Sequence, residues 1–237
     1  MLCNITTDAG NWRAFEPRLR AFLGKLPISG AASAPWQIDA RPGFEGFTVP
    51  ATVNFVGKGG NIYRLGYQPT GAIWVVMNHL NTTWLWDKLR VEAGAYGASC
   101  HYDTHSGGFA FVSYRDPNLQ ATLDIYDKSA EFLRAAPVGE AELTRNIIGV
   151  IGSMDTYQTP DAKGWTSMAN WLIGATDDLN QRRREEILSA SPADFRKLAD
   201  ALAELARHGN VVVLGSEHAI AEANARREGV LQVTKLI

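Results

Sequence analysis

Cysteine is scarce in this sequence. The 237 residues include only two cysteines, Cys3 and Cys100, whereas a secreted chain held together by a disulfide framework carries many more. This scarcity fits a reducing compartment, so we expect an intracellular protein, in a bacterial cytoplasm or an organelle matrix. A single bridge between Cys3 and Cys100 stays open as an alternative.

An excess of charge of one sign and long apolar runs are also absent. The chain has 23 basic and 25 acidic side chains, a net charge of -2, so we expect no nucleic acid as a partner. No apolar run approaches the roughly 20 residues of a membrane-spanning helix, so we expect no membrane partner. The first residues, MLCNITTD, lack the pattern of a secretory signal. These residues have the composition of the middle of a strand, which predicts a domain excised from a longer polypeptide.

The common catalytic signatures are missing as well. There is no G-x-S-x-G nucleophile motif, and neither cysteine has the context of an activated thiolate. The glycine-rich run GKGG at residues 57–60 lacks the spacing of a phosphate-binding loop. We interpret this run as a turn at the end of a strand.

Four potential metal ligands, Cys100, His101, Asp103 and His105, cluster within six positions. On a helix, the i,i+4 spacing of the two histidines would present both imidazoles to one zinc ion. However, no glutamate stands where a catalytic base is needed, and the flanking residues read as strand. We therefore predict a polar strand face and no metal site in this chain. A self-contained metal hydrolase that uses His101 and His105 is the alternative.

Apolar periodicity predicts both strands and helices, without regular βαβ alternation. Strands are expected at residues 2–6, 51–56, 211–214 and 230–236, with two more within 96–114. Helices are expected at residues 12–23, 71–90, 116–133, 143–151, 161–175 (continuing to about 188) and 191–209, with a connector at 28–50. This order predicts an α+β fold: a two-layer sandwich in which helices cover one face of a mostly antiparallel sheet.

The segment NTTWLWDKLRVEAGAYG, residues 81–97, holds the strongest candidate site. Its amphipathic part ends in Arg90, and glycines stand on both sides of the Ala95-Tyr96 pair. A guanidinium and a phenol that a turn brings together form two donors suited to developing negative charge, which is half of a catalytic site. On pattern alone, the favoured interpretation is an ordinary surface arginine and a half-buried turn tyrosine.

Long stretches of the chain resemble one family. From about Asn54 to about Ile187 the sequence is similar to the C-terminal part of the presequence proteases, a branch of the pitrilysin and insulin-degrading-enzyme superfamily. The matching stretches are VNFVGKGGNIYRLGY (53–67), the segment 81–97, SYRDPNLQATLDIYDKSAEFLR (113–134), IIGVIGSMDTYQTPDAKG (147–164) and QRRREEIL (181–188).

The resemblance implies a fold and a cofactor. Enzymes of this family are zinc metalloendopeptidases built from four homologous α+β domains, each like a domain of the mitochondrial processing peptidase, which close over a peptide. The first domain holds zinc through an H-x-x-E-H motif. Residues 1–237 would form a single domain, the fourth, which binds no zinc. No cofactor is therefore expected in this chain, and zinc is expected in the N-terminal domain.

The resemblance also implies site residues. The family motif R-V-x-G-G-A-Y-G corresponds here to residues 90–97, with Ala93 in place of a glycine. Arg90 and Tyr96 would be catalytic, and Gly94 and Ala95 would bind substrate. The expected partners are a short unstructured peptide and the N-terminal catalytic half of the same polypeptide, so the chain alone would be inactive. The alternative is a non-catalytic structural or interaction module of the superfamily.

Overall fold

The structure is a computed structural model that describes residues 2–27, 35, 43–135, 138–226 and 231–236. It divides into two compact units. The smaller unit comprises Met1–Ala40 and Thr156–Asn180, and the larger unit comprises Arg41–Asp155 and Gln181–Ile237. The prediction of a single domain over residues 1–237 stays a prediction.

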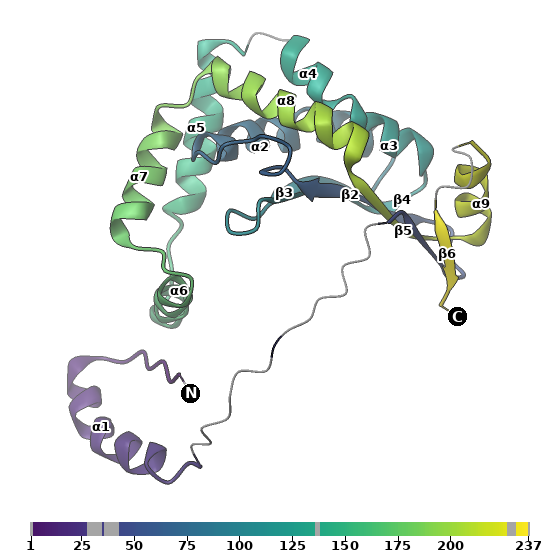
Figure 1. The fold of residues 1–237 in the computed structure, drawn as a ribbon. Helices are drawn as coiled ribbons and strands as arrows, with labels where there is room; N and C mark the ends of the chain where they lie inside the picture. The colour runs from purple at the N-terminus through teal and green to yellow at the C-terminus, as the bar shows by residue number, and fades with distance from the viewer. Residues whose placement is uncertain (1, 28–34, 36–42, 136–137, 227–230, 237) are drawn as a thin grey trace. The chain divides into compact units, whose positions relative to one another are not determined.

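The smaller unit is built on two helices, α1 (Ala9–Leu23) and α6 (Pro160–Leu172) (Figure 1). The side chain of Asp8 caps α1, because its carboxylate accepts the N–H groups of Gly10 and Asn11 at 2.8 and 2.9 Å. The predicted first helix is thus confirmed. The predicted strand at residues 2–6 is wrong: Asn4 donates its side-chain amide to the carbonyl of Gly164 in α6, at 2.9 Å.

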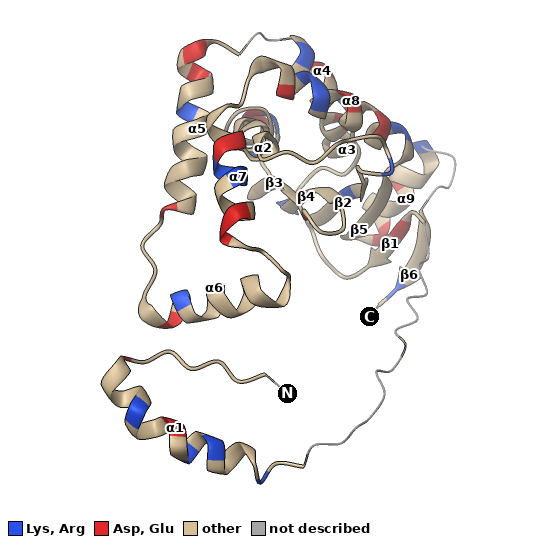
Figure 2. Cartoon of the chain, turned by 60° about the vertical axis from the view of Figure 1, so that its left-hand side comes forward, with Lys and Arg blue, Asp and Glu red and all other residues tan. Residues whose placement is uncertain are grey.

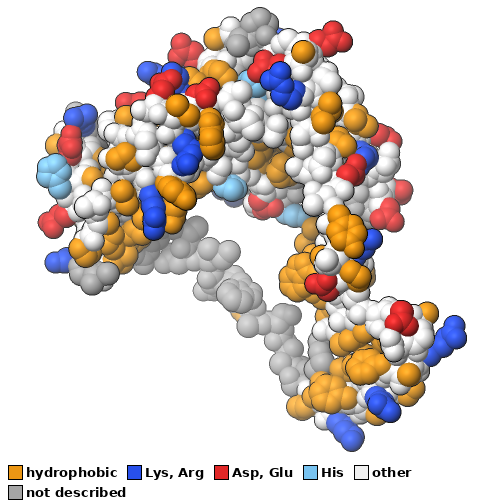
Figure 3. Space-filling view, turned by 180° about the vertical axis from the view of Figure 1, so that it is seen from behind, with side chains coloured by type: hydrophobic (Ala, Val, Ile, Leu, Met, Phe, Trp, Pro, Cys, Tyr) orange, Lys and Arg blue, Asp and Glu red, His pale blue; other side chains and the backbone are white. Residues whose placement is uncertain are grey.

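Hydrophobic side chains of the smaller unit are open on the face drawn in Figure 3. Those with exposed fractions of 43% or more include Phe15, Phe22, Trp165 and Trp171. Among the described residues of α1 and α6, none is buried. This unit therefore has no hydrophobic core of its own within the described part of the chain.

In the larger unit, six strands of the described chain form one mixed sheet (Figure 1). The spatial order is β3-β4-β2-β5-β1-β6. The pairs β3/β4, β4/β2 and β2/β5 are antiparallel, and β5/β1 and β1/β6 are parallel. The strands are β1 (Glu45–Thr48), β2 (Asn54–Asn61), β3 (Gly97–Tyr102), β4 (Gly108–Asp116), β5 (Asn210–Gly215) and β6 (Gln232–Lys235).

Helices cover one face of this sheet, as Figure 1 shows for α2, α3, α4 and α8. The longest of them, α8, begins with a capping box formed by Ser191 and Asp194. Its apolar stripe is buried together with the inward-facing side chains of the strands, such as Val56, Phe111 and Val213. The α+β fold with one covered sheet face is therefore confirmed. The elements are α2 (Ala72–Thr82), η1 (Trp86–Glu92), α3 (Gln120–Asp127), α4 (Ser129–Ala135), α5 (Glu140–Met154), α7 (Asp177–Leu188), α8 (Pro192–His208) and α9 (Glu217–Arg226).

The glycine-rich run at residues 57–60 was predicted as a turn, and this prediction is wrong. The run lies inside β2, paired with both β4 and β5. A side chain at Gly59 would stand 2.6 Å from the carbonyl oxygen of Phe109, so the close approach of the strands requires glycine there. Lys58 is only 4% exposed, and its ammonium group binds Asp127 and the carbonyl of Ala206 on the helical side.

Other boundaries also differ from the predictions; the single helix predicted at 71–90, for example, is α2 followed by η1. Strand β1 lies inside the predicted connector 28–50, of which residues 28–34 and 36–42 fall outside the described part. The helix predicted from Asp116 begins at Gln120, because Asp116 closes β4 and its buried carboxylate accepts from Thr122 and the N–H of Asn118.

Charged residues are spread over the helices of the chain (Figure 2). Both acidic and basic side chains occur along α7 (Figure 2), where Arg184 binds Asp155 through two hydrogen bonds of 2.7 and 2.6 Å. Among the helices of the described residues, none combines the length and the hydropathy of a membrane-spanning segment.

His79 is a buried titratable group in the helical layer. Its ring stacks on Phe132 and meets Phe195 edge-on, with ring centroids 5.4 Å apart in both pairs. Burial lowers the pKa of His79 from the ordinary 6.5, while Glu142, 3.4 Å away, opposes this shift. The neutral imidazole is therefore the form that the folded state favours.

We expect the chain to lose stability as the pH falls below 6.5. A group with a lowered folded-state pKa stabilises the fold above its unfolded pKa, and that contribution is lost as the pH falls towards the folded value. The Tm difference between pH 7.5 and pH 5.5 should be smaller in His79→Phe than in the parent. The exposed His218 provides the control: His218→Phe should keep the parental difference, and an equal change in both variants would contradict the account.

Candidate active site

Arg90 lies on η1, a π-helix of seven residues. The N–H of Ala93 donates to the carbonyl of Lys88 at 3.1 Å, the i→i+5 bond that widens the helical turn. Leu89 is fully buried and anchors this segment in the core. Segments of π-helix are rare and occur frequently at functional sites, and here the segment ends beside the predicted catalytic turn.

The turn after η1 brings Tyr96 to the edge of the sheet. Gly94 has a φ of +80°, a backbone conformation that favours glycine. Ala95 is 2% exposed, and its N–H donates to the carbonyl of Leu89 at 2.8 Å. The side-chain amide of Asn118 donates to the carbonyl of Ala93 at 2.8 Å and closes the turn from the other side. Substrate contact by Gly94 and Ala95 stays a prediction.

Arg90 and Tyr96 meet in the structure. The Arg90 guanidinium lies 5.1 Å from the centre of the Tyr96 ring and 5.2 Å from that of Trp86. Its Nη1 donates a hydrogen bond to the carbonyl oxygen of Tyr96. The Tyr96 side chain is 63% exposed, and among the described residues no carboxylate forms an ion pair with Arg90. The exposed Tyr96 ring can therefore meet a ligand directly, while Arg90 is half-buried beside it.

Two neighbours in this site, Tyr114 and Arg115, were not among the predicted site residues. The ring of Tyr114 contacts that of Tyr96 with centroids 5.8 Å apart, and the Arg115 guanidinium lies 6.0 Å from the Tyr96 ring. In a regular strand, successive side chains point to opposite faces, so one of these two consecutive residues would be expected to point towards the core and not into the site. Both residues lie in the stretch SYRDPN, which belongs to one of the segments that match the family, and this match is the sequence signal that could have identified them.

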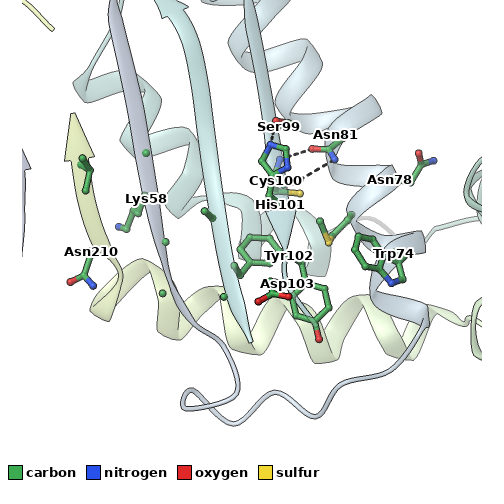
Figure 4. A pocket seen from close by; sticks show the side chains of 18 of the residues that line it. Lys58, Trp74, Asn78, Asn81, Ser99, Cys100, His101, Tyr102, Asp103 and Asn210 are labelled. Atoms are coloured by element: carbon green, nitrogen blue, oxygen red, sulfur yellow. Dashed lines mark hydrogen bonds between the residues drawn. The ribbon is translucent and has the colours of Figure 1, made fainter. Parts of the chain in front are cut away.

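The uncovered face of the sheet is hollowed beside these residues. A groove of about 630 Å³ includes Phe55, Val112 and Tyr114 in its lining, and a larger hollow of about 980 Å³ extends towards α2 and α5. Gly57, Ser99 and Val212 line both, so the two form one continuous surface. Figure 4 shows the larger hollow, where Trp74 and Asn81 of α2 stand beside β3.

The outer edge of β3 is partly covered by a side chain. Asn81 accepts the N–H of Cys100 at 2.7 Å and donates to its carbonyl at 3.4 Å, as the dashed lines in Figure 4 show. An amide side chain thus takes the place of a neighbouring strand at this position.

The four potential metal ligands do not converge. Cys100 is buried, which raises the pKa of its thiol to about 12, and His101 shares a hydrogen bond of 2.9 Å with Ser99. Asp103 accepts the N–H groups of His105 and Ser106 within a turn. Within the described part of the chain, no three His, Cys, Asp or Glu side chains are grouped to hold a metal ion. The described residues therefore do not fit a zinc site.

Known sequences match this chain over nearly its whole length. The family model described as the PreP C-terminal domain matches residues 44–217. Presequence protease 1, chloroplastic/mitochondrial, of Arabidopsis thaliana is 42% identical over 237 residues, 100% of this chain and 22% of that protein. Protein HypA of Clostridium perfringens is 29% identical over 222 residues, 94% of this chain and 23% of that protein. The chain thus spans about a fifth of the length of these relatives.

Solved structures share the fold. The peptidase M16 inactive domain from Pseudomonas fluorescens aligns with a TM-score of 0.61 at 14% identity, over 89% of this chain and 51% of that chain. Pitrilysin aligns with a TM-score of 0.53 at 12% identity, over 88% of this chain and 23% of that chain. At these identities the likeness establishes the α+β architecture alone.

Gly94→Ala tests the turn. Alanine at a φ of +80° is strained, so we expect the free energy of unfolding to fall by about 1–2 kcal/mol, measured by urea titration at 25 °C. The matched control is Gly97→Ala, where the backbone is not left-handed and the nearest atom to an added Cβ is 4.0 Å away. The control should change stability by less than about 0.5 kcal/mol. Equal losses in the two variants would contradict the role given to Gly94.

Proposed function

Because this chain belongs to the PreP C-terminal domain family, we propose that it completes the peptide-cleaving site of a zinc metalloendopeptidase. It is a C-terminal domain of the M16 presequence-protease type. In the proposal, Arg90 and Tyr96 act on a peptide held between this domain and the N-terminal half of the same polypeptide. The substrate class is short unstructured peptides, and a bacterial or organellar location stays a prediction.

The contact between the Arg90 guanidinium and the exposed Tyr96 ring carries this proposal. Hydrolysis of a peptide bond places negative charge on the carbonyl oxygen of the substrate. A phenol O–H and a guanidinium N–H fixed in advance stabilise that oxygen without reorganisation during the reaction. Arg90 donates to the backbone carbonyl of Tyr96, and this bond fixes the guanidinium beside the residue that carries the phenol.

The metal in this proposal is held outside the described residues. They offer no group of three suitable ligands, so no metal-dependent step is assigned to this chain. Because Arg90 and Tyr96 lie on a different domain from the metal, peptide cleavage requires the two halves of the complete polypeptide to close over the substrate. The proposal therefore includes that the 237-residue chain alone cleaves no peptide.

A second candidate function is a non-catalytic structural or interaction module. It is favoured by the likeness to a domain from Pseudomonas fluorescens that is described as inactive. Arg90 and Tyr96 would then be incidental surface residues. The two functions differ in what the loss of the Tyr96 hydroxyl does to the complete protein.

Tyr96→Phe in the complete peptidase separates these functions. Removal of one donor to the oxyanion should lower kcat/KM by about 10²–10³-fold, measured with a fluorogenic unstructured peptide. Tyr157→Phe is the matched control, because Tyr157 is 81% exposed and removal of its hydroxyl should leave kcat/KM unchanged. Parental kcat/KM in Tyr96→Phe would remove Tyr96 from the mechanism and favour the non-catalytic module.

A further inference from the structure

A β-bulge lies in β4 next to the candidate site. Asn54 pairs with Asp116 and Val56 pairs with Ser113, so two residues of β4, Tyr114 and Arg115, stand opposite the single residue Phe55. Such a bulge holds one extra residue and changes the direction of the side chains that follow, and bulges are frequent next to active sites.

The bulge turns two consecutive side chains to the same face. Along β4, Val112 is exposed and Ser113 is buried, as alternation requires, but Tyr114 and Arg115 are both exposed before Asp116 is buried again. In a regular strand, Arg115 would point towards the helical layer. The extra residue instead places its guanidinium 5.5 Å from the Tyr114 ring and 6.0 Å from the Tyr96 ring.

The backbone of Arg115 is strained. Its φ of +49° is the only positive value at a non-glycine residue in the described chain. Such conformations persist where the surroundings enforce them, and they cluster at functional sites. The Tyr96 N–H donates to the carbonyls of Tyr114 and Arg115, at 3.1 and 3.3 Å. The strained residue is thus bound directly to the backbone of the proposed catalytic tyrosine.

Positive charge at this point has no internal counterion. Within the described chain, no carboxylate forms an ion pair with Arg90 or Arg115, whereas the exposed Arg134 and the half-buried Arg184 each pair with an aspartate. The acidic residues nearest in sequence are engaged: Glu92 binds Lys88 at 2.7 Å, and Asp116 is buried with hydrogen bonds to Thr122 and Asn118. Two guanidiniums within 6.0 Å of one ring therefore form a cationic site open to solvent.

From this geometry we infer that Arg115 is a specificity residue that binds a carboxylate of the peptide substrate, beside the bond positioned by Arg90 and Tyr96. The inference rests on the proposed function. A planar guanidinium binds a carboxylate through two parallel hydrogen bonds. Tyr114, whose ring lies 5.5 Å from the guanidinium, also lines the apolar groove with Phe55 and Val112, and this groove suits the rest of an extended peptide. The carboxylate is either an acidic side chain or the C-terminus of the peptide.

The test crosses a panel of peptides with variants of the complete peptidase. The panel starts from one cleaved peptide without acidic residues and with an amidated C-terminus. Its members add either a free C-terminus or one Glu, placed at each position in turn, with Gln at the same position as the reference. A carboxylate at the matching place should lower KM by about tenfold or more, because a charge-assisted hydrogen bond contributes at this level, with kcat nearly unchanged.

Three substitutions isolate Arg115. Arg115→Gly removes the guanidinium and relieves the strained φ, so its Tm should equal or exceed that of the parent while the preference for the carboxylate disappears. Arg115→Gln should also abolish the preference. Arg64→Gln is the matched control, since Arg64 is an exposed arginine beyond the opposite end of β2, and it should retain the preference in full.

Each result decides the matter. Loss of the preference in both Arg115 variants, with the preference retained in Arg64→Gln, supports the inference, and the preferred peptide identifies the source of the carboxylate. The inference is wrong if no carboxylate improves KM in the parent, or if the improvement survives Arg115→Gly. If Tyr96→Phe is fully active as well, the proposed function fails with it. If only the Arg115 variants behave like the parent, the function stands and this inference alone fails.

Discussion

One backbone amide joins the two irregular segments of this domain. The N–H of Tyr96, at the end of the turn after η1, donates to the carbonyls of Tyr114 and Arg115 in the bulge of β4. Without these hydrogen bonds, the π-helix and the β-bulge would orient their side chains independently of each other. Because this amide holds them together, a phenol and two guanidiniums lie within a few ångströms of one another on the open side of the sheet.

The regular structure provides the rigidity that this junction needs. Leu85 and Leu89 are fully buried and hold η1 on the core, while the buried Asp116 holds the end of β4 through Thr122. The strained φ of Arg115 is tolerated because both flanking segments are fixed. A site carried on such anchored elements keeps its donors aligned more closely than one carried on free loops. The same arrangement leaves the side chains of Tyr96 and Arg115 outside the core, where a peptide can reach them.

Much of this fold follows from sequence pattern, and the failures have physical causes. The helix at α8 was predictable because its capping box and apolar stripe agree, and the β3 and β4 pair because its residues alternate. Residues 57–60 were misread because glycine favours turns in isolation, whereas here its missing side chain allows close strand approach at Gly59. Strand β1 was missed because its four residues carry only one large apolar side chain, Phe47. The segment at 2–6 has strand composition but forms no strand, and Asn4 within it binds Gly164 of α6.

The site itself was predicted in part. Arg90 and Tyr96 were identified through a family motif, and the structure brings them together. The π-helix and the bulge leave no trace in hydrophobic periodicity, because each adds a single residue to a regular element. Arg115 therefore looked like an ordinary strand residue next to Asp116. The direction of the Arg115 side chain becomes clear only from the strand register, because the pairing of Val56 with Ser113 places the bulge at Tyr114 and Arg115.

The most direct test of the account is a crystal structure of the complete peptidase with a bound phosphinic peptide, whose tetrahedral oxygens mimic the oxyanion. The account predicts that the Tyr96 hydroxyl and an Arg90 N–H each lie about 2.5–3.2 Å from one phosphinyl oxygen. A peptide bound in the closed enzyme with both side chains turned away from that oxygen would contradict it.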